Sequence, residues 1–82
     1  MEGKKVQVIL HTPILVPVHG EGKKSTHEEP VLKIKGQVKG FSEAGLSLEV
    51  AEYIGEKGQV YPPLHKLLFL PRHKIDHLYI LN

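Results

Sequence analysis

The sequence predicts an all-β protein, a small and strongly bent antiparallel sheet of five strands that closes into a barrel. Apolar residues recur mostly at every second position, which is the period of a half-buried strand. Clusters of Gly and Pro divide the chain into short segments joined by short connections. The length of 82 residues is enough for one hydrophobic core, so we expect a single domain over residues 1–82.

The first apolar segment, residues 6–18, predicts either an edge strand or two short strands separated by a bend. Val6 and Val8 alternate with polar neighbours, whereas Pro13 and Pro17 each remove a backbone N–H donor from the ladder. Residues 19–29 (HGEGKKSTHEE) contain two glycines and no apolar side chain. This polar stretch predicts an exposed loop.

The next segment predicts a strand with a buried face and a basic outer face. Leu32, Ile34 and Val38 alternate with lysines, and Gly36 permits a bulge or a sharp bend. The alternative is that Lys33, Lys35 and Lys39 only keep the edge of the strand soluble and have no further role.

Residues 43–54 are compatible with two structures, of which the strand is favoured. A helix would place Leu48 among the glutamates, whereas a strand places Leu46, Leu48 and Val50 on one face. Gly45 also disfavours a helix. Residues 54–63 follow as a turn or loop, because they contain two glycines and the pair Pro62-Pro63.

The last part of the chain predicts two strands, residues 67–70 and 75–81, joined by a tight corner at 71–74. Both strands carry apolar residues on both faces, more than a barrel of this size can bury alone. Exposed apolar edges associate, so we expect a homo-oligomer, with a closed ring as one form. The alternative is that the second apolar face of these two strands packs under the loop at 61–64 of the same chain.

Composition limits the functions that remain. The formal net charge is +2, too weak to imply nucleic-acid binding by bulk charge, so such a function must rest on local clusters. The chain has no Cys, which excludes disulfides and thiolate metal sites. No apolar run is long enough to suggest a signal peptide or a membrane span, so we expect a cytoplasmic protein without membrane partners.

Two segments, 36–48 and 67–80, resemble the signatures of the Sm-like family. The run Gly-Gln-Val-Lys-Gly-Phe at 36–41, followed by Leu-Ser-Leu at 46–48, is similar to the first signature, and especially to bacterial Hfq. The layout of residues 69–75, with Arg72-His73 before Ile75, resembles the Lys-His-x-Ile of the second signature. The resemblance implies a barrel of Sm-like or SH3-like type, ring assembly through the last two strands, and binding of single-stranded RNA.

Under that resemblance we expect the RNA-binding residues to lie at the corner and near the first turn. Arg72, His73 and Lys74 would contact phosphates, and Lys39 would add to the positive potential. Phe41 would stack on a base if it is exposed, as would Tyr53, whereas the competing expectation places Phe41 in the core.

The alternative function is a small barrel that serves as a protein-interaction or structural module without nucleic-acid binding. It is favoured by three departures from the family around the first turn. Ser42 stands in place of the family's Asp, Gly45 is the residue nearest to its Asn, and Ala44 falls where Hfq has an aromatic residue.

No catalytic or metal-binding residues are expected. His73 and His77 are four apart, but in a strand they stand roughly 13 Å from each other. His65 and His73 could approach across a hairpin, yet no third ligand for zinc is evident. The carboxylate pairs Glu28-Glu29 and Glu49 with Glu52 are expected to be solvated. We find no phosphate-binding loop or nucleophile motif, so the sequence predicts no enzyme, cofactor or small-molecule substrate.

Overall fold

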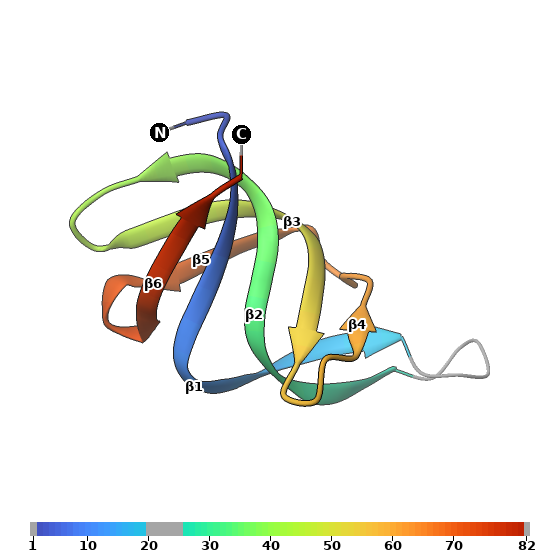
Figure 1. The fold of residues 1–82 in the computed structure, drawn as a ribbon. Helices are drawn as coiled ribbons and strands as arrows, with labels where there is room; N and C mark the ends of the chain where they lie inside the picture. Colours follow the sequence, from blue (N-terminus) through green and yellow to red (C-terminus); the bar gives the residue numbers. More distant parts are fainter. Residues whose placement is uncertain (1, 20–25, 82) are drawn as a thin grey trace.

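A computed structural model of the chain describes residues 2–19 and 26–81. The described residues form strands and one short 3-10 turn, η1, arranged as one bent sheet (Figure 1). In chain order the elements are β1 (Lys5–His19), β2 (Thr26–Phe41), β3 (Gly45–Gly55), β4 (Val60–Tyr61), β5 (Leu67–Pro71), η1 (Arg72–Lys74) and β6 (Ile75–Ile80).

The predicted all-β, antiparallel class is confirmed. The strands lie in the order β4-β3-β2-β1-β6. β5 pairs with residues 45–49 of β3, and β4 pairs with residues 53–54 of the same strand. The sixth strand is the two-residue β4, which the Gly- and Pro-rich connection conceals in the sequence. The predicted closure into a barrel is wrong: among the described residues β5 pairs only with β3 and β6 only with β1, so the sheet stays open. These two edges are consecutive in the chain and are joined by η1.

β1 is one continuous strand with a bend in its middle. Its register against β2 shifts between Ile9 and Ile14, and Pro13 lies inside this shift. The first half of β1 is central, between β2 and β6, so the expected edge strand is wrong for this half. The second half pairs with β2 alone, and Pro17 is tolerated there because one side of the strand needs no donor.

The predicted loop at residues 19–29 needs a correction at its end. β2 begins at Thr26, and residues 26–29 pair with residues 16–19 of β1. Val16 and Val18 are buried and fix this half of the hairpin, so polar residues can complete its ladder. Residues 20–25 of the predicted loop lie outside the described residues.

The ambiguous segment at 43–54 is a strand, as predicted. Leu46, Leu48 and Val50 face the core, whereas Ser47 and Glu49 lie on the outer side and are only partly buried. A Cβ atom at Gly45 would collide with the carbonyl oxygen of Leu70, so β5 can approach the start of β3 because this residue is glycine.

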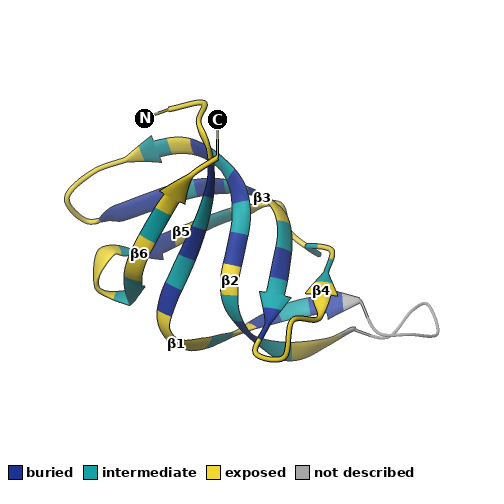
Figure 2. Cartoon of the chain, viewed as in Figure 1, coloured by how far each residue is buried: buried dark blue, intermediate teal, exposed yellow. Residues whose placement is uncertain are grey.

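The core lies between the two halves of the bent sheet, where the inward residues of β1, β2, β3 and β5 meet (Figure 2). In β2 the buried positions shift at a bulge near Val31, so Val31 rather than Leu32 is fully buried. The buried residues are Val6, Val8, Leu10, Val16, Val18, Val31, Ile34, Val38, Leu46, Leu48, Val50, Tyr53 and Leu70.

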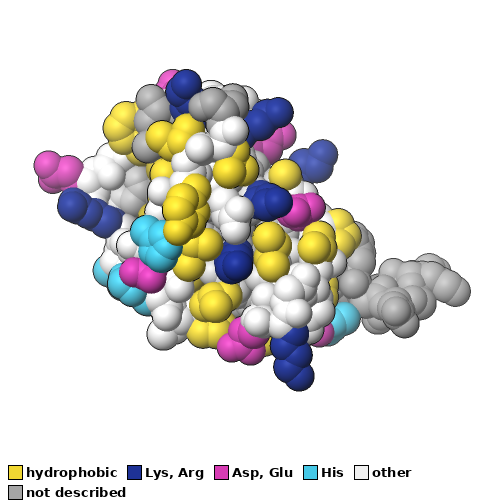
Figure 3. Space-filling view, viewed as in Figure 1, with side chains coloured by type: hydrophobic (Ala, Val, Ile, Leu, Met, Phe, Trp, Pro, Cys, Tyr) yellow, Lys and Arg dark blue, Asp and Glu magenta, His cyan; other side chains and the backbone are white. Residues whose placement is uncertain are grey.

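β5 buries one face and exposes the other, whereas β6 has no fully buried residue and is exposed on both faces. In β5, Leu70 is buried, but Leu67 is 73% exposed and Phe69 is 50% exposed. In β6, Tyr79 and Ile80 are about half exposed. The loop at 61–64 therefore does not cover these side chains, and hydrophobic side chains spread over the face formed by β6 and β1 (Figure 3).

Candidate functional site

The three predicted phosphate-contacting residues form the 3-10 turn η1, between the two open edges of the sheet. Arg72 and His73 are exposed and Lys74 is partly buried. None of the three has an ion-pair partner among the described residues.

A main-chain hydrogen bond joins this basic corner to the turn between β2 and β3. The N–H of Arg72 donates to the carbonyl oxygen of Ala44 over 2.9 Å. Gly45 pairs with Pro71, directly before the corner. Two segments that are about 30 residues apart in the sequence are thereby fixed side by side at one end of the molecule (Figure 1).

Phe41 ends β2 at the entrance to this turn and is 60% exposed. The expectation that Phe41 belongs to the core is therefore wrong, because the strand ends at this residue and the core ends with Leu46 opposite it. Tyr53 is only 4% exposed, so it is not available for stacking.

The turn after Phe41 is held by the side chain of Ser42. The Ser42 hydroxyl accepts a hydrogen bond from the N–H of Ala44 over 3.1 Å, as an Asp side chain would in the same kind of turn. The main chains of Ser42 and Gly45 also bond to each other in both directions, at 2.9 and 3.3 Å. Ser42 thus holds the local turn through an uncharged side chain, and Glu43 is the acidic residue of this turn.

Lys39 is exposed on β2 but is not an isolated charge. Its Nζ lies 3.3 Å from Oε1 of Glu49 on β3, so much of its potential is compensated. Of the predicted site residues, Lys39 is the one that the structure gives an acidic partner.

The carboxylates that the sequence suggested to be solvated mostly have partners. Oε2 of Glu52 lies 3.7 Å from Nζ of Lys35, and Oε2 of Glu29 lies 2.7 Å from Nε2 of His27. Glu29 also accepts a hydrogen bond from the Tyr61 hydroxyl over 3.4 Å. Burial, followed by the Glu29 carboxylate, raises the pKa of the Tyr61 phenol above its ordinary value.

Two histidines share one carboxylate at the junction of β1 and β6. His11 Nδ1 lies 3.7 Å from Asp76 Oδ1, and His77 Nδ1 lies 3.3 Å from Asp76 Oδ2. In residues 2–19 and 26–81 no group of three or more His, Asp or Glu side chains is arranged to hold a metal ion.

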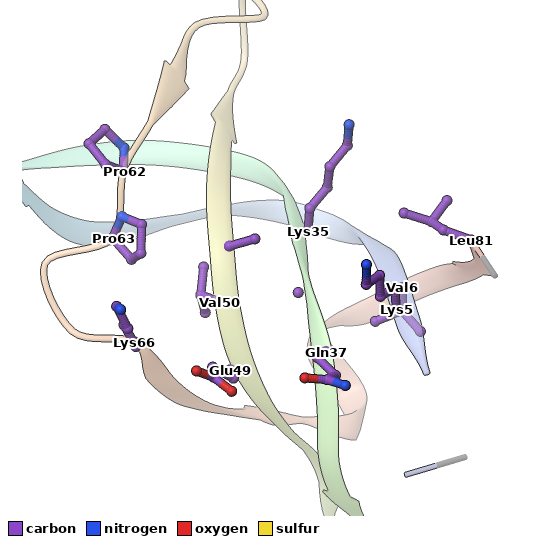
Figure 4. A pocket seen from close by; sticks show the side chains of 12 residues that line it. Lys5, Val6, Lys35, Gln37, Glu49, Val50, Pro62, Pro63, Lys66 and Leu81 are labelled. Atoms are coloured by element: carbon purple, nitrogen blue, oxygen red, sulfur yellow. The ribbon is translucent and has the colours of Figure 1, made fainter. Parts of the chain in front are cut away.

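Sequence reasoning missed a groove on the outer side of the sheet, with a volume of about 600 Å³. Its floor is formed by β2 and β3, with Pro62 and Pro63 on one side and Leu81 on the other (Figure 4). No local pattern could have revealed it, because it combines residues from the beginning, the middle and the end of the chain. Three lysines line this groove, namely Lys5, Lys35 and Lys66.

Comparisons with protein-family models, with curated proteins and with solved structures find no match to this chain. Within the described residues, no helix has the length and apolar character needed to cross a membrane.

Proposed function

We propose that this protein binds single-stranded RNA through the basic corner at Arg72–Lys74, with Phe41 as a stacking platform. The observation that carries the proposal is the main-chain bond between Arg72 and Ala44, which holds three unpaired basic residues beside the turn that follows an exposed aromatic ring. Phosphate-binding cations beside an aromatic face are the two parts of a single-strand site. The resemblance to Sm-like proteins supports the same function.

The proposal includes assembly of several copies of the chain, through the open edges at β5 and β6. Leu67 and Phe69 on one edge, with Tyr79 and Ile80 on the other, expose apolar surface that a neighbouring copy would cover. Different edges that meet make a head-to-tail contact, which closes into a ring when the rotation permits. A ring would repeat the basic corner in every subunit and concentrate its charge. A cytoplasmic location is part of this proposal.

RNA binding is tested by filter-binding titrations with oligo-U and oligo-A over a series of salt concentrations. We expect affinity to fall with salt and to be lost in the Arg72→Ala/Lys74→Ala protein. Each lost phosphate contact should reduce the slope of log K against log salt by about 0.7. The control is Lys33→Ala/Lys57→Ala, which removes two exposed lysines elsewhere and should leave the slope unchanged. No binding at low salt would refute the RNA function.

Assembly is tested separately by light scattering. Masses of two or more times 9.2 kDa support it, whereas a monomer at 9.2 kDa across micromolar concentrations refutes it.

The second candidate is a protein-interaction module without nucleic-acid binding, and it is favoured by the same exposed edges. In that case the apolar residues of β5 and β6 would contact a different protein, and the corner would carry no ligand. Absence of RNA binding in a folded monomer would favour this candidate.

A further inference from the structure

We propose that the groove over β2 and β3 binds a small organic anion. The ligand would have an apolar hydrocarbon or aromatic part and one carboxylate, sulfonate or phosphate group. The site is separate from the basic corner and does not depend on RNA binding. It concerns the binding of a ligand, and no chemical step is proposed.

The hollow arises where the pairing of β2 and β3 is irregular. Lys35 pairs with Glu52 and Gly36 with Val50, so Ala51 is an extra residue on β3 with no partner on β2. Bulges of this kind are common beside binding sites because they interrupt the regular surface of a sheet. Ala51 is exposed, and its small side chain leaves the space above the strands open.

The walls of the groove are fixed to the same irregular point. The N–H of Val50 donates to the carbonyl oxygen of Lys66 over 2.6 Å, which anchors the segment that follows Pro62 and Pro63 against β3. On the opposite side, the N–H of Leu81 donates to the carbonyl oxygen of Lys5 over 2.7 Å. Both walls therefore stand at defined positions before any ligand arrives, which reduces the entropic cost of binding.

The volume and the chemistry of the lining fit an amphipathic molecule. A space of about 600 Å³ falls within the range of ligand pockets, roughly 300–1,000 Å³. Pro62, Pro63 and Leu81 supply apolar surface (Figure 4). A wholly polar ligand would leave this surface without a complementary partner.

The charge at the rim selects an anion. The lining contains three lysines and one carboxylate, Glu49, which is already paired with Lys39 from outside the groove. Lys35 lies 3.7 Å from Glu52, but Lys66 has no ion-pair partner among the described residues. Lys66 is therefore the primary contact for the anionic group, and Lys35 is the second.

The experiment uses 8-anilinonaphthalene-1-sulfonate as the probe and follows its fluorescence together with backbone amide shifts of the labelled protein. We expect saturable binding and shifts at residues 35–37, 49–51 and 62–66. Octanoate and 1-naphthyl phosphate should both displace the probe if the site accepts either anionic group, and displacement by one alone identifies the group. Inorganic phosphate and 1-octanol should displace it poorly, because each has only half of the required chemistry.

Three variants make the test specific. Ala51→Phe fills the hollow at an exposed position and should abolish binding. Lys66→Gln should weaken binding by about 1.4- to 5-fold, as expected for the loss of one exposed charge contact. Lys57→Gln makes the same charge change in the turn before β4 and should have no effect.

The proposal is overturned if the amide shifts map to Leu67, Phe69 and Tyr79 instead, or if Ala51→Phe binds the probe normally. It is also overturned if 1-octanol competes as well as octanoate. The Arg72→Ala/Lys74→Ala protein should bind the probe unchanged, so failure of this site and failure of RNA binding are distinguishable.

Discussion

Replacement of Phe41 separates a role in binding from a role in folding. Phe41 is 60% exposed, so less than half of its surface is removed from water. A fully buried Phe→Ala change costs about 3–5 kcal/mol, which scales to about 1–2 kcal/mol at this position. We therefore expect Phe41→Ala to remain folded, with a modest decrease in its free energy of unfolding in urea.

The same substitution should have a larger effect on RNA affinity. Stacking of one base on an aromatic side chain contributes about 1–3 kcal/mol, which corresponds to roughly a 5- to 150-fold loss in affinity for oligo-U. Because stacking does not depend on cations, the salt slope should stay the same, in contrast to Arg72→Ala/Lys74→Ala. Titration at constant salt by fluorescence anisotropy measures the loss directly.

Two conservative variants show whether the aromatic face is responsible. Phe41→Tyr retains the ring and should bind oligo-U as the parent does. Phe41→Leu retains apolar surface without a ring and should resemble Phe41→Ala. Parental affinity in Phe41→Leu, or an unchanged affinity in Phe41→Ala, would refute the stacking platform while leaving the basic corner to be tested by its own variants.

Three further predictions follow from packing, edges and burial. A Cβ at Gly36 would lie 2.5 Å from the Glu49 carbonyl oxygen, whereas one at Gly40 would meet nothing within 4 Å. In chemical denaturation, Gly36→Ala should therefore lower the free energy of unfolding by about 1–3 kcal/mol, and Gly40→Ala should leave it unchanged. Leu67→Lys/Phe69→Lys should dissociate the proposed oligomer in light scattering, whereas Leu15→Lys, at a residue that is 63% exposed elsewhere, should not. Burial raises the pKa of the Tyr53 phenol above 10.0, so the protonated phenol contributes stability below pH 10 that is lost as pH rises through the folded pKa. The urea midpoint of the parent protein should therefore fall more steeply in this range than that of Tyr53→Phe. An identical decline in both proteins would contradict the assignment.

The period of apolar residues determined most of the strands. Leu46, Leu48 and Val50 define a buried face only if the chain is extended, and the structure places all three in the core. The corner at Arg72–Lys74 was also predictable, because polar residues separate two apolar runs there. The period failed at polar residues 26–29, where the partner strand supplies the buried side chains, and at the two-residue β4.

The candidate site was predictable as a set of residues but not as an arrangement. The sequence indicated which side chains are basic or aromatic, because those are properties of single residues. It could not show that Phe41 is exposed while Tyr53 is buried, or that Lys39 is paired with Glu49. Exposure and pairing depend on which strands lie side by side.

By itself, the sequence determined the all-β class and the presence of apolar residues on both faces of the last two strands, since alternation and composition are local. Only the tertiary structure decided that β5 and β6 are open edges, that Arg72 is bonded to Ala44, and that the groove exists. The physical reason is that strand pairing joins residues that are far apart in the chain, and neither the register nor the bulge at Ala51 is encoded in any single segment.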